Sequence, residues 1–256
     1  MDVISELMGV PAADRDELRR LADLVLHRDD GMRDVPPEGI DAALTLVGYY
    51  ADLLAERRRA PRDDLTSALA VAEVQGDRLA DQEIIAFLFL MIVAGNETTT
   101  ELLGNAIFWA DRNPAQLASV LAEHGRVTKW VEETLRYDGS TQLLARHLRR
   151  DVTLHGRVAP AGSKLVLLLG SANRDEEVFP HGDDFDLDRD TSALASFGGG
   201  RHYCLGANLA RLEANIALDA LLTRIRGYTV DVSRAERVHS VNVRGFASLP
   251  VTLQPR

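Results

Sequence analysis

Cys204 is the residue with the most distinctive chemistry in this sequence, because it is the only cysteine among 256 residues. It lies in the stretch FGGGRHYCLG, residues 197–206, between two groups of glycines. A lone thiol excludes an internal disulfide and a zinc site built from several thiolates. Glycine permits a positive φ angle and lets a ligand approach the main chain closely. We expect both properties at the glycines of this loop, Gly198, Gly199, Gly200 and Gly206.

Several kinds of site can contain such a loop. A dinucleotide-binding fingerprint is excluded because Tyr203 stands at its third glycine position, and a phosphate-binding loop because no Gly-Lys-Ser/Thr follows. A cysteine nucleophile with His202 as its base is disfavoured, because residues two apart at the start of a helix point in different directions. A buried, inert cysteine stays open. The remaining interpretation is a thiolate metal ligand, and a single thiolate suits a haem iron.

Two other segments place ionisable side chains at helical spacing. The segment AGNETTTE, which begins at Ala94, follows an apolar run with six polar residues, more than one helical circle. It either leaves the core for solvent or presents Glu97 and Thr98 to a buried cavity, where they could pass protons. The Thr98 hydroxyl can also donate back to the Ala94 carbonyl and loosen the helix. Glu133 and Arg136 share a helix face, which alone indicates only an ordinary surface pair.

Composition and charge limit the class of protein. The chain is 46% hydrophobic and 27% charged, which is typical of a globular protein, and its few aromatic residues favour helix. A net charge of −10 argues against binding to nucleic acid or to anionic membranes through bulk charge. The longest apolar run, residues 84–94, is too short to span a bilayer, and the first residues lack signal-peptide features. We therefore expect a cytoplasmic protein with a reduced thiol and no membrane partner.

The hydrophobic periodicity predicts a mainly α-helical chain with small β-sheets. The first expected helix is amphipathic and covers 13–30, with Leu18, Leu21, Leu24 and Val25 on one face. It is followed by a helix that ends near Arg59, a short helix in DDLTSALAVAE, a helix that is capped by Asp81 and stops before Pro114, and two helices over about 114–123 and 126–139. The last expected helix runs from Cys204 to Gly227, with Leu205, Leu209, Leu212 and Ile216 on one face. Short strands are expected over 143–170, then an irregular loop, and a hairpin at the end. We expect one domain over 1–256, with a helical part to about 142, a mixed part over about 143–196, the cysteine loop and its helix over 197–227, and the hairpin over 228–256.

Taken together, these segments resemble the cytochromes P450 of the soluble bacterial type. Phe197, Gly200, Cys204 and Gly206 match the F-x-x-G-x-x-x-C-x-G loop of that family. AGNETT resembles the oxygen-activating stretch of its long central helix, EETLR its E-x-x-R pair, and NRDEEVF with DDFDLDR its irregular segment before the haem loop. The resemblance runs from near residue 1 to the end but begins partway along the family's chain. It implies a P450-like haem-thiolate fold whose large N-terminal part is missing.

The resemblance also implies a cofactor and roles for individual residues. Haem b (iron protoporphyrin IX) would be bound, with Cys204 as the iron ligand, and its thiolate would favour O–O cleavage. The cofactor-binding residues would be Arg146 and His202 at the propionates, Phe197 beside the sulfur, Gly200, Cys204 and Gly206. Glu133, Arg136 and Arg189 would form a structural charge network, and Glu97 and Thr98 would deliver protons. Residues expected to face the substrate are Val93, Ala94, Leu143, Leu144, Val241, Asn242 and Val243, which favour an apolar or amphipathic compound.

The implied function is a monooxygenase that inserts one oxygen atom from O2 into a small organic substrate, or the haem-carrying fragment of one. Electrons would come from a ferredoxin or flavodoxin docked near Cys204, where Arg201 and Arg211 offer positive charge. A complete chain would be a monomer, whereas an incomplete substrate pocket would expose apolar surface and so favour self-association. The alternative is a non-catalytic P450-like helper or binding protein. The missing N-terminal part of the family's chain argues for that alternative, and the retention of Cys204, Glu97 and Thr98 argues against it.

Overall fold

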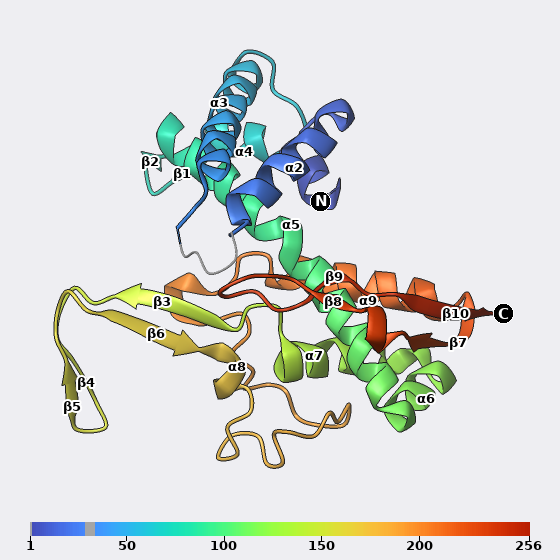
Figure 1. Ribbon diagram of the computed structural model, residues 1–256. Coiled ribbons are helices and arrows are strands. Elements are labelled where there is room, and N and C mark those ends of the chain that lie inside the picture. The colour runs from blue at the N-terminus through green and yellow to red at the C-terminus, as the bar shows by residue number, and fades with distance from the viewer. Residues whose placement is uncertain (1, 29–33) are drawn as a thin grey trace. The chain divides into compact units, whose positions relative to one another are not determined.

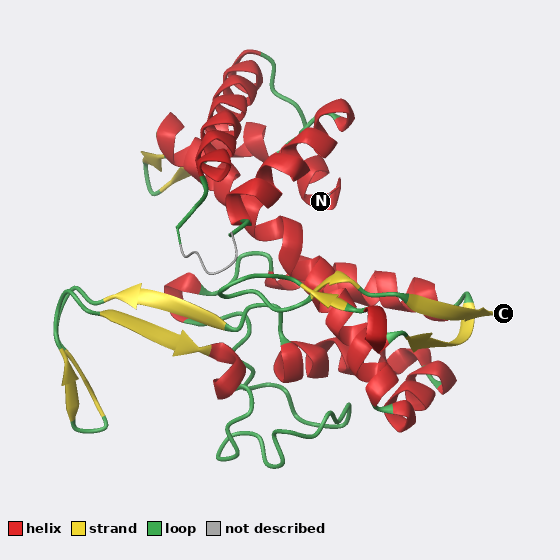
Figure 2. Ribbon diagram, in the orientation of Figure 1, coloured by secondary structure: helices red, strands yellow, loops and turns green. Residues whose placement is uncertain are grey.

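The computed structural model of the protein describes residues 2–28 and 34–256, without the side chain of Asn96. These residues form mainly α-helices, with pairs of short strands between and after them, which confirms the predicted fold class (Figures 1 and 2). The chain divides into two compact units, one over Met1–Thr98 and His239–Val241 and the other over Thr99–Val238 and Asn242–Arg256. Each unit has buried apolar residues of its own. The single domain over 1–256 stays a prediction.

The first unit is built from helices and one short strand pair. Its elements are α1 (Asp2–Met8), a 3-10 turn (Ala12–Asp14), α2 (Arg15–Leu26), α3 (Pro37–Arg59), α4 (Leu65–Val71), the antiparallel strands β1 (Glu73–Val74) and β2 (Asp77–Arg78), and the first part of α5 (Asp81–Arg112). The helix predicted over 13–30 ends at Leu26, because His27 takes an extended conformation with ψ 142°. The prediction for residues 29–30 lies outside the described residues.

Helices α2 and α3 pack against each other and supply much of the core of the first unit. Leu18 and Leu21 of α2 are buried, as is Leu46 of α3. Leu24 and Val25, the other two members of the predicted apolar face of α2, are half-buried. The amphipathic pattern thus identifies the side of α2 that faces α3.

Helix α5 carries the polar stretch AGNETTTE in its middle. The Ala80 carbonyl accepts the Ile84 N–H at 3.0 Å, so Ala80 holds the N-cap position and the prediction of Asp81 there is wrong. The Asp81 carboxylate pairs with Arg58 instead. The helix continues without a break through Gly95 and ends at Arg112, before the proline, as predicted.

Within the described part of the chain, α5 is long and apolar enough to cross a membrane by length and composition. The core helix of a soluble protein passes the same test, so this is weak evidence for a membrane span. Glu97 and Glu101 lie near the middle of the helix. Ionised side chains are unfavourable at the centre of a bilayer, which argues against a membrane span.

The second unit combines the rest of α5 with shorter helices and antiparallel strand pairs. Its helices are α6 (Pro114–Ala122), α7 (Val127–Asp138), α8 (Leu169–Ala172) and α9 (Ala207–Leu222), with 3-10 turns at His124–Arg126, Gly200–His202 and Val232–Arg234. Its strand pairs are β3 (Leu143–His147) with β6 (Lys164–Leu168), β4 (Val152–Leu154) with β5 (Arg157–Ala159), β7 (Ile225–Val230) with β10 (Val251–Pro255), and β8 (Glu236–Arg237) with β9 (Phe246–Ser248). In Figure 1, β3 lies beside β6, and β7 lies beside β10 in a separate pair.

The end of α9 differs from the prediction. The helix predicted to reach Gly227 stops at Leu222, because the following residues form strand β7. Ile225 and Tyr228 of β7 are buried in the core, and pairing with β10 keeps this segment extended. Gly227 therefore lies inside a strand, opposite Gln254. In place of the single C-terminal hairpin predicted over 228–256, β7 pairs with β10, and β8 pairs with β9 in the segment between them.

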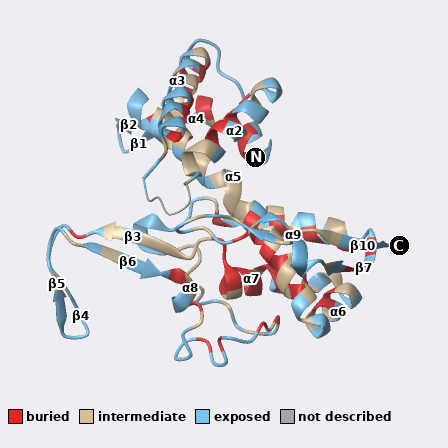
Figure 3. Ribbon diagram, viewed as in Figure 1, coloured by how far each residue is buried: buried red, intermediate tan, exposed pale blue. Residues whose placement is uncertain are grey.

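The core of the second unit surrounds Trp130 of α7, which is fully buried and donates through its Nε1 to the Ala106 carbonyl at 3.0 Å. Figure 3 shows α7 as largely buried. Other members of this core come from α5, α7 and α9: Leu102, Ala106, Ala110, Val131, Leu135, Ala214, Leu218 and Leu222. Helix α7 is thus the central support of the elements that carry the candidate site.

Helix α9 buries the face opposite to the apolar face that the sequence predicts. Leu205, Leu212 and Ile216 are 72%, 56% and 60% exposed, and Leu209 is half-buried. The buried side consists of small and medium residues, Ala207, Ala214, Leu218 and Leu222. Alanine side chains let two helices approach closely, which explains why this side faces α7.

Candidate functional site

The cysteine loop is a main-chain turn that leads into α9. The Cys204 N–H donates to the Phe197 carbonyl at 2.9 Å, and the Tyr203 N–H donates to the Gly200 carbonyl at 3.1 Å. The Cys204 carbonyl accepts the Ala207 N–H at 3.3 Å as the helix begins. The side chain of Cys204 is exposed. The turn thus closes on itself and presents the thiol at the surface of the second unit, so the inert buried cysteine is excluded.

The glycines of the loop do not all take the conformation that we predicted. Gly198 and Gly200 have positive φ angles of 67° and 62°, which disfavour any residue with a side chain. Gly199 is extended and Gly206 has φ −84°, so neither needs to be glycine for its backbone. A Cβ atom on Gly199, Gly200 or Gly206 would meet nothing within 4 Å. Open space therefore lies beside the loop, where a bound group could approach the main chain.

Arg211 of α9 lies against this loop but does not present a free positive charge. It donates through Nε and Nη2 to the two carboxylate oxygens of Glu132 at 2.6 and 3.0 Å. The pair is neutral as a unit, so our expectation that Arg211 attracts an acidic electron donor is weakened. Arg201, the other arginine expected to attract the electron donor, is exposed in the 3-10 turn before the cysteine.

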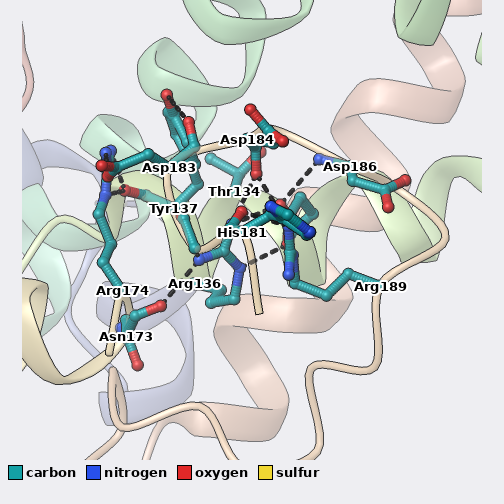
Figure 4. Close-up of polar contacts among 12 residues, drawn as sticks. Thr134, Arg136, Tyr137, Asn173, Arg174, His181, Asp183, Asp184, Asp186 and Arg189 are labelled. Carbon is teal, nitrogen blue, oxygen red and sulfur yellow. Dashed lines mark hydrogen bonds and ion pairs between the residues drawn. The ribbon is translucent and has the colours of Figure 1, made fainter. Parts of the chain in front are cut away.

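Glu133 and Arg136 form a buried ion pair on α7. The guanidinium donates through Nε and Nη2 to the two Glu133 oxygens at 2.8 and 2.7 Å. Its remaining N–H groups bind main-chain carbonyls of the irregular loop, at Asn173, Gly182 and Asp184, over 2.8 to 3.0 Å. Figure 4 shows Arg136 among the residues of this loop. The pair therefore holds the loop to α7.

Arg189 completes this network from the far end of the irregular loop. Its Nε lies 3.6 Å from Glu133 Oε1, and its Nη2 donates to the His181 carbonyl at 2.8 Å. The Asp186 N–H donates to the same Glu133 oxygen at 2.9 Å. One buried carboxylate thus serves two guanidinium groups and a main-chain amide. Figure 4 shows Arg136, Asp186 and Arg189 near one another.

The expected propionate contacts lie on separate elements of the second unit. Arg146 is half-buried on β3, and its Nη1 donates to the Ala145 carbonyl at 3.0 Å. His202 is exposed at the end of the 3-10 turn before Cys204. Their binding roles stay predictions.

The proton-relay candidates lie on α5 in the first unit, whereas Cys204 belongs to the second. Glu97 and Thr98 are half-buried, and the Thr98 hydroxyl donates to the Ala94 carbonyl at 3.1 Å, which confirms the predicted hydrogen bond but not the predicted loosening of the helix. Their roles in proton delivery stay predictions.

Sequence reasoning missed Glu101, the buried acid of the polar stretch. It is 6% exposed, and its Oε2 accepts the Phe246 N–H at 2.6 Å. A Cβ atom on Gly245 would overlap this carboxylate, so the two segments lie in close contact. The available signal was that six successive polar residues must turn at least one inward.

Part of the expected substrate-facing set lies together in the second unit. The Gln142 N–H donates to the Asn242 carbonyl at 2.8 Å, and Thr141 forms a β-bridge with Val243. Leu143 and Leu144 follow directly on β3 and are half-buried. The other expected members, Val93, Ala94 and Val241, belong to the first unit.

Replacing Glu101 with glutamine should stabilise the chain at neutral pH. Burial raises the pKa of Glu101, and this effect outweighs the Phe246 N–H and the Arg237 charge, which lower it. A carboxyl whose pKa rises on folding stabilises the fold below its unfolded pKa, and that contribution is lost as pH rises through the folded pKa. In urea unfolding, Glu101→Gln should exceed the wild type at pH 7 and converge with it below the ordinary pKa of 4.5.

The exposed Glu236 of β8 provides the control for this prediction. Glu236→Gln should differ little from the wild type at either pH, because an exposed carboxyl has similar surroundings in both states. A difference between Glu101→Gln and the wild type that does not change with pH would contradict the assignment.

The family model for cytochrome P450 matches residues 42–254, so the chain belongs to the cytochrome P450 family. It is 60% identical to "Putative cytochrome P450 123" of Mycobacterium tuberculosis, over 100% of this chain and 64% of that protein. It is 38% identical to the vitamin D(3) 25-hydroxylase of Pseudonocardia autotrophica, over 100% of this chain and 63% of that protein. The family consists generally of haem monooxygenases.

A solved structure confirms the P450 fold. The structure of cytochrome P450 CYP109Q5 from Chondromyces apiculatus matches with a TM-score of 0.91 and 37% identity, covering 100% of this chain and 64% of that one. The chain thus spans less than two thirds of the length of these relatives.

Proposed function

We propose that this chain carries the haem-thiolate centre of a monooxygenase that inserts one oxygen atom from O2 into an apolar or amphipathic small organic substrate. The observation that carries the proposal is Cys204, a sole and exposed thiol that a closed glycine-rich turn presents at the start of α9. Membership of the cytochrome P450 family supports it. No comparison favours the non-catalytic alternative.

The residues present fit a haem group. One thiolate is a suitable axial ligand for haem iron, and the open space beside Gly199, Gly200 and Gly206 leaves room for a flat macrocycle near the main chain. Arg146 and His202 would hold the propionates, and Phe197 would lie beside the sulfur. When bound, the haem supplies the activation of O2, and the thiolate tunes it by donating electron density.

The other side chains of the proposal act around this centre. Cys204 would hold its sulfur as the thiolate, because a metal ligand must be deprotonated. Glu97 and Thr98 would deliver protons, the role that the resemblance to the family gives them. The predominantly apolar side chains of Leu143, Leu144 and Val243 would exclude water and bind the substrate. A ferredoxin or flavodoxin would supply the electrons.

Replacing Cys204 with serine tests the proposal. In the 256-residue chain reduced and treated with carbon monoxide, the wild type should show a strongly red-shifted Soret band, and Cys204→Ser should lose that shift completely. Ser248→Ala, which removes an exposed hydroxyl on β9, should keep it. A wild-type spectrum without the shifted band, or an unchanged band in Cys204→Ser, would overturn the assignment of the thiolate.

A further inference from the structure

A side-chain cluster, of which the proposed function uses only Phe197, holds both ends of the cysteine turn. The guanidinium of Arg211 lies over the ring of Phe197, with 4.5 Å from Cζ to the ring centroid. Its Nη1 lies 3.5 Å from the Tyr203 hydroxyl, directly before the cysteine. Two further hydrogen bonds, at 2.6 and 3.0 Å, anchor the same guanidinium to Glu132 of α7. We call the ion pair of Glu132 and Arg211 the clamp.

We infer that the clamp positions the thiol of Cys204, with Arg211 and Glu132 acting as positioning residues and not as ligands. The link to the cysteine is through Phe197, because the Phe197 carbonyl accepts the Cys204 N–H at 2.9 Å. Holding the Phe197 side chain therefore holds the partner of the cysteine amide. The inference rests on the proposed function, because that function gives the Cys204 thiol its role as the haem-iron ligand.

The backbone of the turn explains why a clamp is needed. Gly198 and Gly200, both with positive φ, lie between Phe197 and Tyr203. Glycine allows this path but also gives the unfolded or opened turn more freedom than any other residue. The glycines therefore permit the turn without fixing it, and contacts at its two ends must select one conformation.

Arginine suits this position better than lysine. Its planar fork matches the two oxygens of Glu132, and the same plane can stack on an aromatic ring. The side chains of Arg211 and Glu132 are 28% and 20% exposed, so solvent screens their interaction less than that of a surface pair. On α7, adjacent carboxylates thus serve two separate tasks, since Glu133 faces the buried network with Arg136.

Amide hydrogen exchange in the 256-residue chain tests the clamp without requiring haem. Arg211→Lys keeps the charge but loses the fork and the stacking plane. Exchange in a peptide that covers residues 197–206 should become about tenfold faster, because local opening determines the exchange of such amides. Glu132→Gln removes the anchor without altering the turn itself, and it should accelerate the same peptide.

An ion pair just before α7 provides the matched control. Arg126, the last residue of the 3-10 turn that precedes α7, pairs with Asp188 at 2.9 Å. Arg126→Lys should leave exchange in residues 197–206 unchanged. Unchanged exchange in both Arg211→Lys and Glu132→Gln overturns the clamp.

The carbon monoxide spectrum separates positioning from general stability. In the haem-loaded chain, Arg211→Lys should convert part of the red-shifted Soret band to an unshifted one, whereas Arg126→Lys should not. A clamp with a purely structural role would lower the thermal midpoint and leave the band position unchanged, which would overturn the inference. If exchange accelerates as expected but Cys204→Ser keeps the shifted band, the proposed function fails while the clamp remains.

Discussion

Replacing Glu133 with glutamine should lower the free energy of unfolding by about 3–5 kcal/mol, because it leaves a buried charge without its partner. Arg136 is fully buried, and Glu133 is the carboxylate that it contacts at 2.7 Å. Arg189 lies 3.6 Å from the same carboxylate, so this one substitution leaves the positive charges of two neighbouring guanidinium groups without the Glu133 carboxylate that compensates them. Because small proteins have about 5–15 kcal/mol of stability, this loss is a large fraction of the total.

The neighbouring carboxylate provides a matched control for this prediction. Glu132→Gln makes the same chemical change one residue earlier on α7, in a pair whose side chains are partly exposed. Exposed or partly exposed pairs contribute about 1 kcal/mol or less. Guanidinium denaturation of both variants, followed by far-ultraviolet circular dichroism, should therefore separate them clearly. Equal losses in the two variants would contradict a special role for burial.

Arg189→Gln keeps the prediction testable if Glu133→Gln does not fold. This change removes the longer contact to Glu133 and the hydrogen bonds to loop carbonyls, but it leaves the Arg136 pair in place. The loss of stability should lie between those of the two glutamate variants. Since the carbonyls of the irregular loop depend on these guanidinium groups, that loop should become more accessible to proteolysis in Arg189→Gln.

Local sequence patterns predict most helices because their causes act within a few residues. Pro114, the first residue of α6, sets the end of α5, and the apolar spacing of α2 identifies Leu18 and Leu21 as core residues. The same reasoning fails for α9, where Leu212 is exposed and Ala214 is fully buried. Both sides of α9 carry leucines, so the local pattern does not show which side packs against α7.

Motif spacing locates parts of the candidate site but not their partners. Cys204, Glu133 and Arg136 stand in short motifs, so the resemblance of these motifs to those of the family makes them candidates. Glu101 gains its role from the Phe246 amide, which is 145 residues away along the chain. Arg211 similarly depends on Glu132, 79 residues earlier. Contacts at such separations follow from the packing of α5, α7 and the C-terminal strands, which one sequence does not reveal.

Replacing Asp64 with asparagine should destabilise the first unit by about 3 kcal/mol, because Asp64 is the buried partner of Arg57. The side chains of Arg57 and Asp64 are 1% and 4% exposed, and Arg57 Nε donates to Asp64 Oδ2. Asp64 Oδ1 accepts the Ser67 N–H at 2.8 Å and caps α4. An asparagine can keep the cap through its oxygen, but it then turns an NH2 group toward the guanidinium. The half-exposed Glu56 would be the remaining carboxylate on Arg57.

The pH dependence of this loss separates charge from shape. Burial alone would raise the pKa of Asp64, but hydrogen bonds from Arg57 and Ser67 outweigh it and hold the pKa below its ordinary value of 3.8. A carboxyl with a lowered pKa stabilises the fold above its unfolded pKa, and this contribution is lost as pH falls through the folded pKa. In urea unfolding, the gap between the wild type and Asp64→Asn should therefore be full at neutral pH and shrink below about pH 4. Asp63→Asn, at the exposed neighbouring residue, should show little loss at any pH. A gap that persists unchanged in acid would mean that Asp64 acts through its shape and not through its charge.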